Sequence, residues 1–184
     1  MYRHLILSAS VCALMTAFVV PTRAASRSND AAVQRKADRV FQAVQYDARQ
    51  ALDHANNLES FRTPDTPGWR MVALQLNELR ADVNDMAHRL QRLQPVSQEA
   101  APWQQAAIDR MSRSVRLLSN YTADAITFAD SNPHDLWSLT YQRYLRDAGH
   151  DARILTRTAD HAVERANKLN QKERPSKGNV RASS

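Results

Sequence analysis

Two short segments of this sequence have the spacing of metal ligands in helical bundles. Asp85 and His88, and again Asp147 and His150, are an acid and a histidine three residues apart. Di-metal carboxylate bundles use Glu-x-x-His on two helices and further carboxylates on the other two, and all of these ligands point inward. Here the apolar residues that flank both segments put the two histidines on the outward face of their helices. The spacing therefore does not predict a metal site.

His54 is the histidine closest to an apolar seam, and Asp47 precedes it by two helical turns. If the helices run antiparallel, the middle of the last helix passes at this level and brings Tyr144 and Asp151 near. These four side chains are the one polar group that the sequence offers as a candidate site. Hydrogen bonding between helices is the expected role, because most buried polar groups are simply satisfied. A haem or metal bound by His54 and a methionine of the seams is the alternative.

No nucleophile, base and orienting group recur at convergent spacing. The sequence therefore assigns no catalytic, cofactor-binding or metal-binding residue, and it predicts no cofactor. The chain has only three glycines, Gly68, Gly149 and Gly178, which lie too far apart for a phosphate loop or a dinucleotide fold. A small periplasmic enzyme with an unrecognised site stays an alternative.

Residues 1–24 have the pattern of a signal peptide. Arg3 and His4 form a short positive segment, residues 5–20 are mostly apolar, and cleavage after Ala24 fits the small residues that precede it. An uncleaved anchor is the alternative, although sixteen interrupted residues are short against the roughly 20 of a spanning helix. The lone cysteine, Cys12, lies in the apolar stretch and leaves with the signal. The mature chain would then have no thiol, which excludes disulfides and thiolate metal sites.

The positive charge is concentrated at the two ends of the chain. There are 25 Lys and Arg against 19 Asp and Glu, a formal net charge of +6. Without the signal and the tail 172–184, the body 25–171 keeps 19 basic and 18 acidic side chains. We therefore expect no nucleic-acid partner, because duplex binders carry a basic face on their folded part. The polar tail 172–184 is predicted to be disordered, with weak contact to anionic surfaces as its one suggested role.

Capping residues and prolines divide the rest of the chain into four helical patterns, over about 29–61, 67–94, 98–131 and 133–171. Three tryptophans, Trp69, Trp103 and Trp137, follow prolines at helix starts and are expected to close the ends of the core. Apolar residues recur every three or four positions in each pattern. These seams comprise Ala37, Val40 with Phe41, Val44, Ala48, Ala51, Ala55 and Leu58; Trp69, Val72, Leu76, Leu79, Val83, Met86, Leu90 and Leu93; Ile108, Met111, Val115, Leu118, Thr122, Ala125 and Ala129; and Trp137, Tyr141, Tyr144 with Leu145, Ala148, Ala152, Leu155, Ala159, Ala162, Ala166 and Leu169.

Short connections force successive helices to run antiparallel. The sequence therefore predicts an all-α fold, an up-down-up-down antiparallel four-helix bundle of long helices over residues 25–171. The alanine-rich first and last helices should approach each other closely. Two alternatives stay open: a three-helix arrangement with a loose first helix, and an antiparallel coiled-coil dimer whose regular seams are covered by a second copy.

The chain resembles uncharacterised exported bacterial helical-bundle proteins, which have no assigned activity. The likeness rests on Trp69, on the Leu76-Asn77 and Val83-Asn84 steps, and on the segments 102–110 (PWQQAAIDR) and 141–145 (YQRYL). It implies one helical domain and export, and it brings no cofactor or catalytic residue.

The expected function is that of an exported, non-enzymatic protein, periplasmic or secreted. It would act by macromolecular binding or self-association in the cell envelope. No transmembrane segment is expected after signal cleavage.

Overall fold

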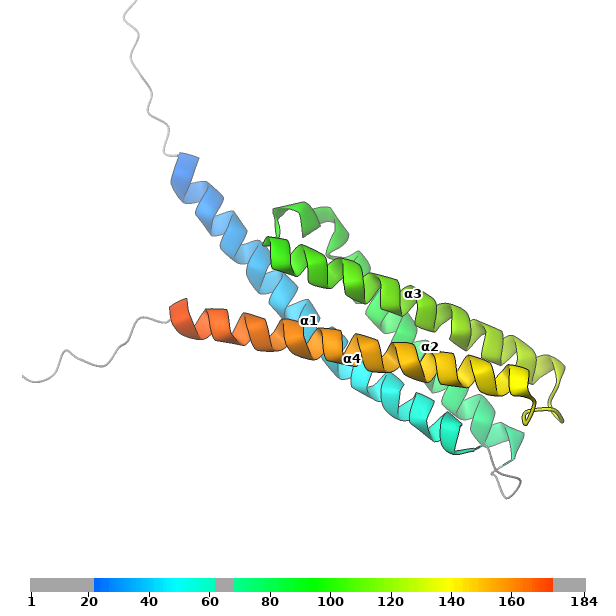
Figure 1. The fold of residues 1–184 in the computed structure, drawn as a ribbon. Coiled ribbons are helices and arrows are strands. Elements are labelled where there is room, and N and C mark those ends of the chain that lie inside the picture. Colours follow the sequence, from blue (N-terminus) through cyan, green and yellow to red (C-terminus); the bar gives the residue numbers. More distant parts are fainter. Residues whose placement is uncertain (1–21, 62–67, 174–184) are drawn as a thin grey trace, which may run out of the picture.

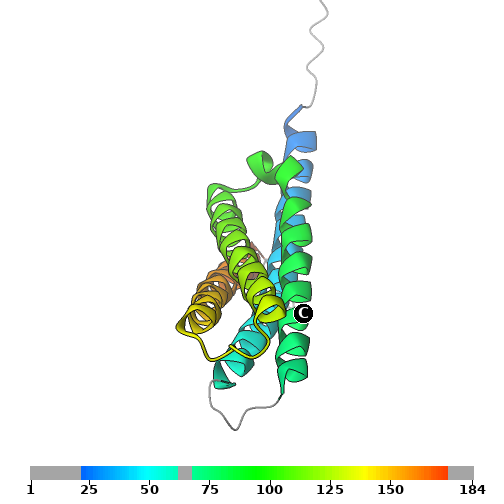
Figure 2. The same ribbon diagram turned by 90° about the vertical axis from the view of Figure 1, so that its right-hand side faces the viewer.

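The computed structural model describes residues 22–61 and 68–173, and every regular element among them is a helix. In chain order these are α1 (Thr22–Ser60), α2 (Trp69–Gln91), the short 3-10 helix η1 (Gln94–Glu99), α3 (Pro102–Ser131) and α4 (Leu139–Glu173). The predicted all-α class is confirmed. The four long helices lie side by side (Figure 1), and η1 lies at the opposite end of the molecule from the α3–α4 connection (Figure 2).

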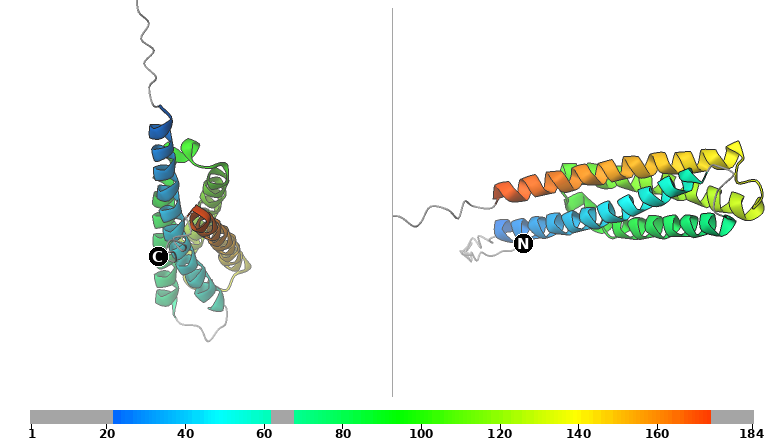
Figure 3. Two further views of the ribbon diagram at one scale, coloured as in Figure 1. Left: turned by 90° about the vertical axis from the view of Figure 1, so that its left-hand side faces the viewer. Right: turned by 90° about the horizontal axis from the view of Figure 1, so that it is seen from below.

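Helix α1 packs against α2 and α4, and α3 packs against the same two helices. The alternative with a loose first helix is therefore wrong. The predicted seams meet in one buried core that draws on all four long helices, and α4 lies beside α1 along much of its length (Figure 3). Phe41, Leu79, Met111 and Leu155 are among its fully buried side chains.

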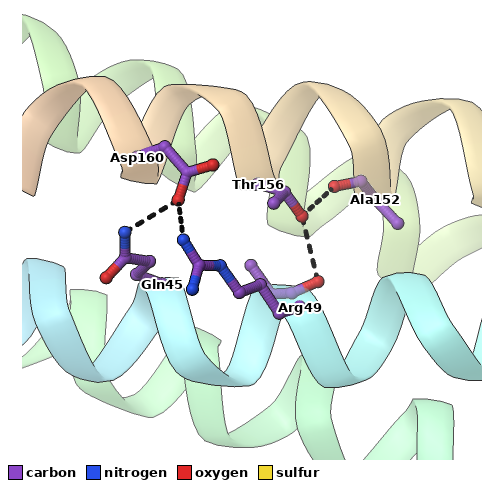
Figure 4. Close-up of polar contacts among 6 residues, drawn as sticks. Gln45, Arg49, Ala152, Thr156 and Asp160 are labelled. Carbon is purple, nitrogen blue, oxygen red and sulfur yellow. Dashed lines mark hydrogen bonds and ion pairs between the residues drawn. The ribbon is translucent and has the colours of Figure 1, made fainter.

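Helices α1 and α4 approach each other closely through their alanines. The Thr156 hydroxyl lies 3.1 Å from the Ala48 carbonyl oxygen of α1 and 2.9 Å from the Ala152 carbonyl oxygen of its own helix (Figure 4). A threonine side chain is short, so it reaches the backbone of a neighbouring helix only where the two backbones come near. Ala48 and Ala152 are fully buried and have no bulk to hold the helices apart.

The third helix begins later than the sequence predicts. Residues 94–99 form η1, and α3 begins at Pro102 and not near residue 98. Proline suits the first helical position, since its missing N–H would have no partner there. The buried Gln104 side chain completes this start, because its Oε1 accepts a hydrogen bond from the Ala101 N–H at 3.2 Å.

The fourth helix also begins later, at Leu139 and not at residue 133. Two successive turns precede it, closed by hydrogen bonds from the Asp135 N–H to the Asn132 carbonyl oxygen and from the Ser138 N–H to the Asp135 carbonyl oxygen. Ser138 then caps the helix, since its Oγ accepts the Tyr141 N–H at 3.3 Å. Helix α1 begins earlier than residue 29, at Thr22, and α2 spans Trp69–Gln91, within the expected 67–94.

Gly149 lies where the Glu59 side chain of α1 passes over α4. A Cβ at this position would lie 3.3 Å from Glu59 Oε1, and Glu59 pairs with Arg153 at 3.5 Å between Oε2 and Nη2. Gly149 is buried, and the space beside it is occupied by the ends of the Glu59 and Arg153 side chains.

Most of the predicted signal peptide and tail lies outside the described residues. Residues 22–24 open α1, and 172–173 close α4. Among the described helices, none combines the length and the hydropathy that crossing a bilayer requires.

Candidate functional site

The polar candidate that the sequence offered is found between α1 and α2. Here Asp47 and His54 of α1 meet Gln75, Asp82 and Arg89 of α2, and we call these five residues the α1–α2 cluster. Arg89 Nε donates to Asp47 Oδ2 at 2.6 Å, and His54 Nδ1 lies 2.9 Å from Gln75 Oε1. His54 Nε2 lies 3.6 Å from Asp82 Oδ2. The cluster thus joins the two helices along about two turns of α1 and about four turns of α2.

The structure brings together half of the predicted group. Asp47 and His54 share the cluster, but His54 faces α2 and makes no described polar contact with Tyr144 or Asp151. Tyr144 packs edge-on against Phe128 at 6.4 Å between ring centroids. Asp151 is buried on α4, and its burial raises the pKa of its carboxyl group. The four side chains that were expected to meet around His54, between the first and last helices, therefore do not form one polar group.

The α2 members of the cluster were missed, although the sequence carries a signal for them. Gln75, Asp82 and Arg89 are seven residues apart, and so are Asp47 and His54. Side chains seven apart lie on one helix face. When two antiparallel helices each have such a row of polar residues on the facing side, the two rows contact each other. The sequence reveals this contact only when it is known which helices are neighbours.

Burial perturbs both carboxyl groups of the cluster. Desolvation raises the pKa of Asp82 to about 6, opposed by His54 and reinforced by the charges of Asp47, Glu78 and Asp85. The Oδ2 atom of Asp82 is fully buried and has no hydrogen-bond partner within the described residues. Desolvation also raises the pKa of Asp47, even though the Arg89 guanidinium lowers it. The carboxylates therefore stay charged here at a cost.

The hydrogen bonds around Gln75 determine which nitrogen of His54 carries its proton. Asn57 Nδ2 donates to Gln75 Oε1 at 3.4 Å, so this oxygen is an acceptor and His54 Nδ1–H donates to it as well. In a neutral imidazole the other nitrogen, Nε2, then has a lone pair, and it faces the Asp82 carboxylate. One proton on either group would replace the repulsion between the lone pair and the carboxylate, 3.6 Å apart, by an attraction. We therefore expect this contact between the two helices to depend on pH.

We predict that Asp82→Asn raises the free energy of unfolding at pH 7 by about 1–2 kcal/mol. In the wild type the folded pKa, about 6, exceeds the ordinary 3.8, so the folded state binds the proton more tightly. That proton stabilises the fold at pH 4, and the stabilisation is lost as the pH rises through 6. Urea unfolding should show the gain of the variant shrinking from pH 7 to pH 4. Asp124→Asn, an exposed change on α3, should show no such trend.

The acid and histidine pairs at metal-ligand spacing lie at the surface. Asp85, His88 and His150 are exposed and Asp147 is half-buried. Within residues 22–61 and 68–173, no three His, Cys, Asp or Glu side chains gather closely enough to hold a metal ion.

Large apolar side chains are exposed at the end of the molecule where α2 and α4 begin. Trp69 is 59 %, Trp137 45 % and Leu139 85 % exposed. Trp69 and Trp137 line one small cleft of about 90 Å³, with Tyr141 and other core residues also lining it. We call Trp69, Trp137 and Leu139 the apolar end. These two indoles do not close the core as the sequence suggested, whereas Trp103 is half-buried.

A search for related proteins gave no match to a family model, a curated protein or a solved structure.

Proposed function

We propose that this chain is an exported, non-enzymatic helical-bundle protein of the periplasm or cell envelope, acting by macromolecular binding or self-association. In this proposal residues 1–24 are a signal peptide and 172–184 a disordered basic tail. The resemblance to exported bacterial helical-bundle proteins supports the same role.

The bundle itself is proposed to have the up-down-up-down antiparallel topology. Contacts between neighbouring helices support it, because residue numbers rise on one helix as they fall on the next. Between α1 and α4 the contacts run from Asp38–Asn170 through Gln45–Asp160 to Ala48–Thr156. Between α1 and α2 they run from Asp47–Arg89 to His54–Gln75, and between α3 and α4 they include Trp103–Arg165 and Phe128–Tyr141.

The observation that carries the binding role is the apolar end. Exposed tryptophans and a leucine that is 85 % exposed, gathered at one end, are a pattern of protein contact sites, where aromatic residues are enriched. Their exposure costs solvation free energy that burial against a partner or a second copy would recover. The α1–α2 cluster, by contrast, joins two helices of the same chain.

Native mass spectrometry of residues 25–184, purified from the protein's own compartment, tests this proposal. We expect a mass of two chains, or of one chain with a macromolecular partner. Substituting Trp69→Gln and Trp137→Gln together should return the mass of a single chain, because the apolar contact is lost. Leu117→Gln is the matched control, since Leu117 is exposed on α3 away from the apolar end.

Three results would count against the proposal. A single chain at every concentration removes the binding role, and complexes that survive the double substitution remove the apolar end as their interface. An added mass of a haem or metal ion would favour the cofactor-binding alternative.

A further inference from the structure

A groove that the sequence did not predict runs between α3 and α4. Its volume is about 410 Å³, within the roughly 300–1,000 Å³ of small-molecule sites. We call this feature the α3–α4 groove. The lining residues are Trp103, Ala106, Ala107 and Arg110 of α3 and Ile154, Arg157, Thr158, His161, Ala162 and Arg165 of α4. Each set follows helical spacing, so one face of each helix forms one wall.

The groove is basic. Arg110, Arg157, Arg165 and His161 line it, and no acidic side chain does. Among the described residues Arg110 and Arg157 have no hydrogen bond or ion pair to an acid. The Arg165 guanidinium lies over the Trp103 ring, 5.1 Å from its centroid. Guanidinium forks match carboxylate and phosphate oxygens in geometry as well as charge.

Two acids near His161 in the chain, Asp160 and Glu164, form their hydrogen bonds with other side chains, although the charge of His161 also acts on both. Asp160 turns to α1, where its Oδ1 accepts hydrogen bonds from Gln45 at 2.7 Å and Arg49 at 2.8 Å (Figure 4). Glu164 pairs with Lys168 at 2.6 Å on its own helix. Neither acid is a lining residue of the groove, so an anion bound there would meet the arginines with no acidic side chain among the lining residues.

Apolar atoms make up the rest of the groove. Ala107 and Ala162 are small, and they leave the space between the helices that larger side chains would fill. Ile154 and the half-buried Trp103 add apolar surface, and Trp103 is backed by the fully buried Phe41 at 6.1 Å between ring centroids. A simple inorganic anion would leave this surface exposed to water, whereas an alkyl chain would cover it.

We propose that the α3–α4 groove binds a single-chain anionic amphiphile, with a phosphate or carboxylate head between Arg110 and Arg157 and an alkyl chain along Ala107, Ala162 and Trp103. This inference goes beyond the proposed function, since it concerns a small ligand at a surface separate from the apolar end.

Dodecyl phosphate, kept below its micelle concentration, is the probe for this site. The chain contains three tryptophans, so Trp69→Phe and Trp137→Phe leave Trp103 as the single fluorophore in the groove. We expect a saturable change in Trp103 emission. Arg110→Ala and Arg157→Ala should each weaken binding about tenfold, the effect of losing one hydrogen bond between charged groups.

Three controls distinguish the contribution of the anionic head to binding, the contribution of the alkyl chain, and any loss of folding in the variants. Arg116→Ala removes an arginine from α3 that lines the opposite groove, between α2 and α3, and should leave the affinity unchanged. Circular dichroism should show all three alanine variants folded, because each arginine is exposed. Inorganic phosphate and dodecyl maltoside, which offer only the anion or only the chain, should bind at least tenfold more weakly.

Several outcomes would overturn the proposal. One is an affinity that Arg110→Ala and Arg157→Ala leave unchanged, and another is equal binding of dodecyl maltoside or of inorganic phosphate. A third is binding to vesicles of anionic phospholipid without any response to dodecyl phosphate, which would point to a membrane surface as the anion. None of these results bears on the complexes formed through Trp69 and Trp137, so the two proposals fail separately.

Discussion

Replacing Phe41 with alanine should lower the free energy of unfolding by about 3–5 kcal/mol, the range for truncating a buried phenylalanine. Phe41 is fully buried, and its ring lies 6.1 Å from that of Trp103 at a tilt of 55°. The substitution removes this contact and leaves a cavity that the helices cannot fill by small shifts. Chemical unfolding followed by far-ultraviolet circular dichroism measures the loss.

Phe41→Ala should also change the environment of Trp103 in the α3–α4 groove. Trp103 contacts both the buried Phe41 ring and the Arg165 guanidinium, so alanine at position 41 removes a support of one wall of the α3–α4 groove. Trp103 emission should then shift toward that of a more exposed indole in the folded variant. Phe41→Leu, which retains most of the volume, should cost less than about 1.5 kcal/mol. A loss below 1 kcal/mol for the alanine variant would show that the core there is not closely packed.

Arg89→Met should lower the free energy of unfolding at pH 7 by about 2–3 kcal/mol. Removing one partner of a buried ion pair costs about 3–5 kcal/mol, and the figure is smaller here because the Arg89 side chain is a third exposed. Asp47 is only 8 % exposed, and Arg89 is its one described hydrogen-bond partner. The variant leaves that carboxylate charged and without compensation.

The pH dependence of this loss follows from the pKa of Asp47. Burial already raises that pKa and Arg89 opposes the rise, so removing Arg89 raises it further. The penalty exists only while Asp47 is charged, and it should therefore fall as the pH is lowered from 7 to 4. Adding Asp47→Asn should recover most of the loss. Arg92→Met, one turn further on at an exposed position, should lower the free energy of unfolding by less than about 0.5 kcal/mol. A loss for Arg89→Met that stays constant between pH 7 and pH 4 would show that it does not depend on the charge of Asp47.

Helical periodicity predicted the core well because it depends only on local spacing. All the seam residues predicted from Ala37 to Leu58 and from Val72 to Leu93 are buried except Val40, which is half-buried. The pattern fails at the ends, where Trp69, Trp137 and Leu169 are exposed. A residue in the first or last turn has the right angle around its helix but no neighbouring helix opposite it.

The candidate site was harder to predict, because it depends on which helix each face meets. His54 lies near a seam in the sequence, but periodicity does not say whether that edge of α1 faces α2 or α4. Several residues before Leu139 could have capped α4, and periodicity does not distinguish among them. In the structure Ser138 is the cap, because its Oγ accepts a hydrogen bond from the Tyr141 N–H. The α3–α4 groove arises from small side chains on two helices, and neither helix alone reveals it.

The contacts between α1 and α4 also bear on the order in which the molecule assembles. They join residues 108 to 132 positions apart, from Ala48–Thr156 to Asp38–Asn170, whereas the His54–Gln75 contact spans only 21. Joining two distant segments of a flexible chain costs more entropy than joining near ones. The pair α1–α2 can therefore form early in folding, and α4 closes onto α1 once the intervening helices have shortened the distance. The alanine-lined interface between α1 and α4 would then be the last part of the core from which water is excluded during folding.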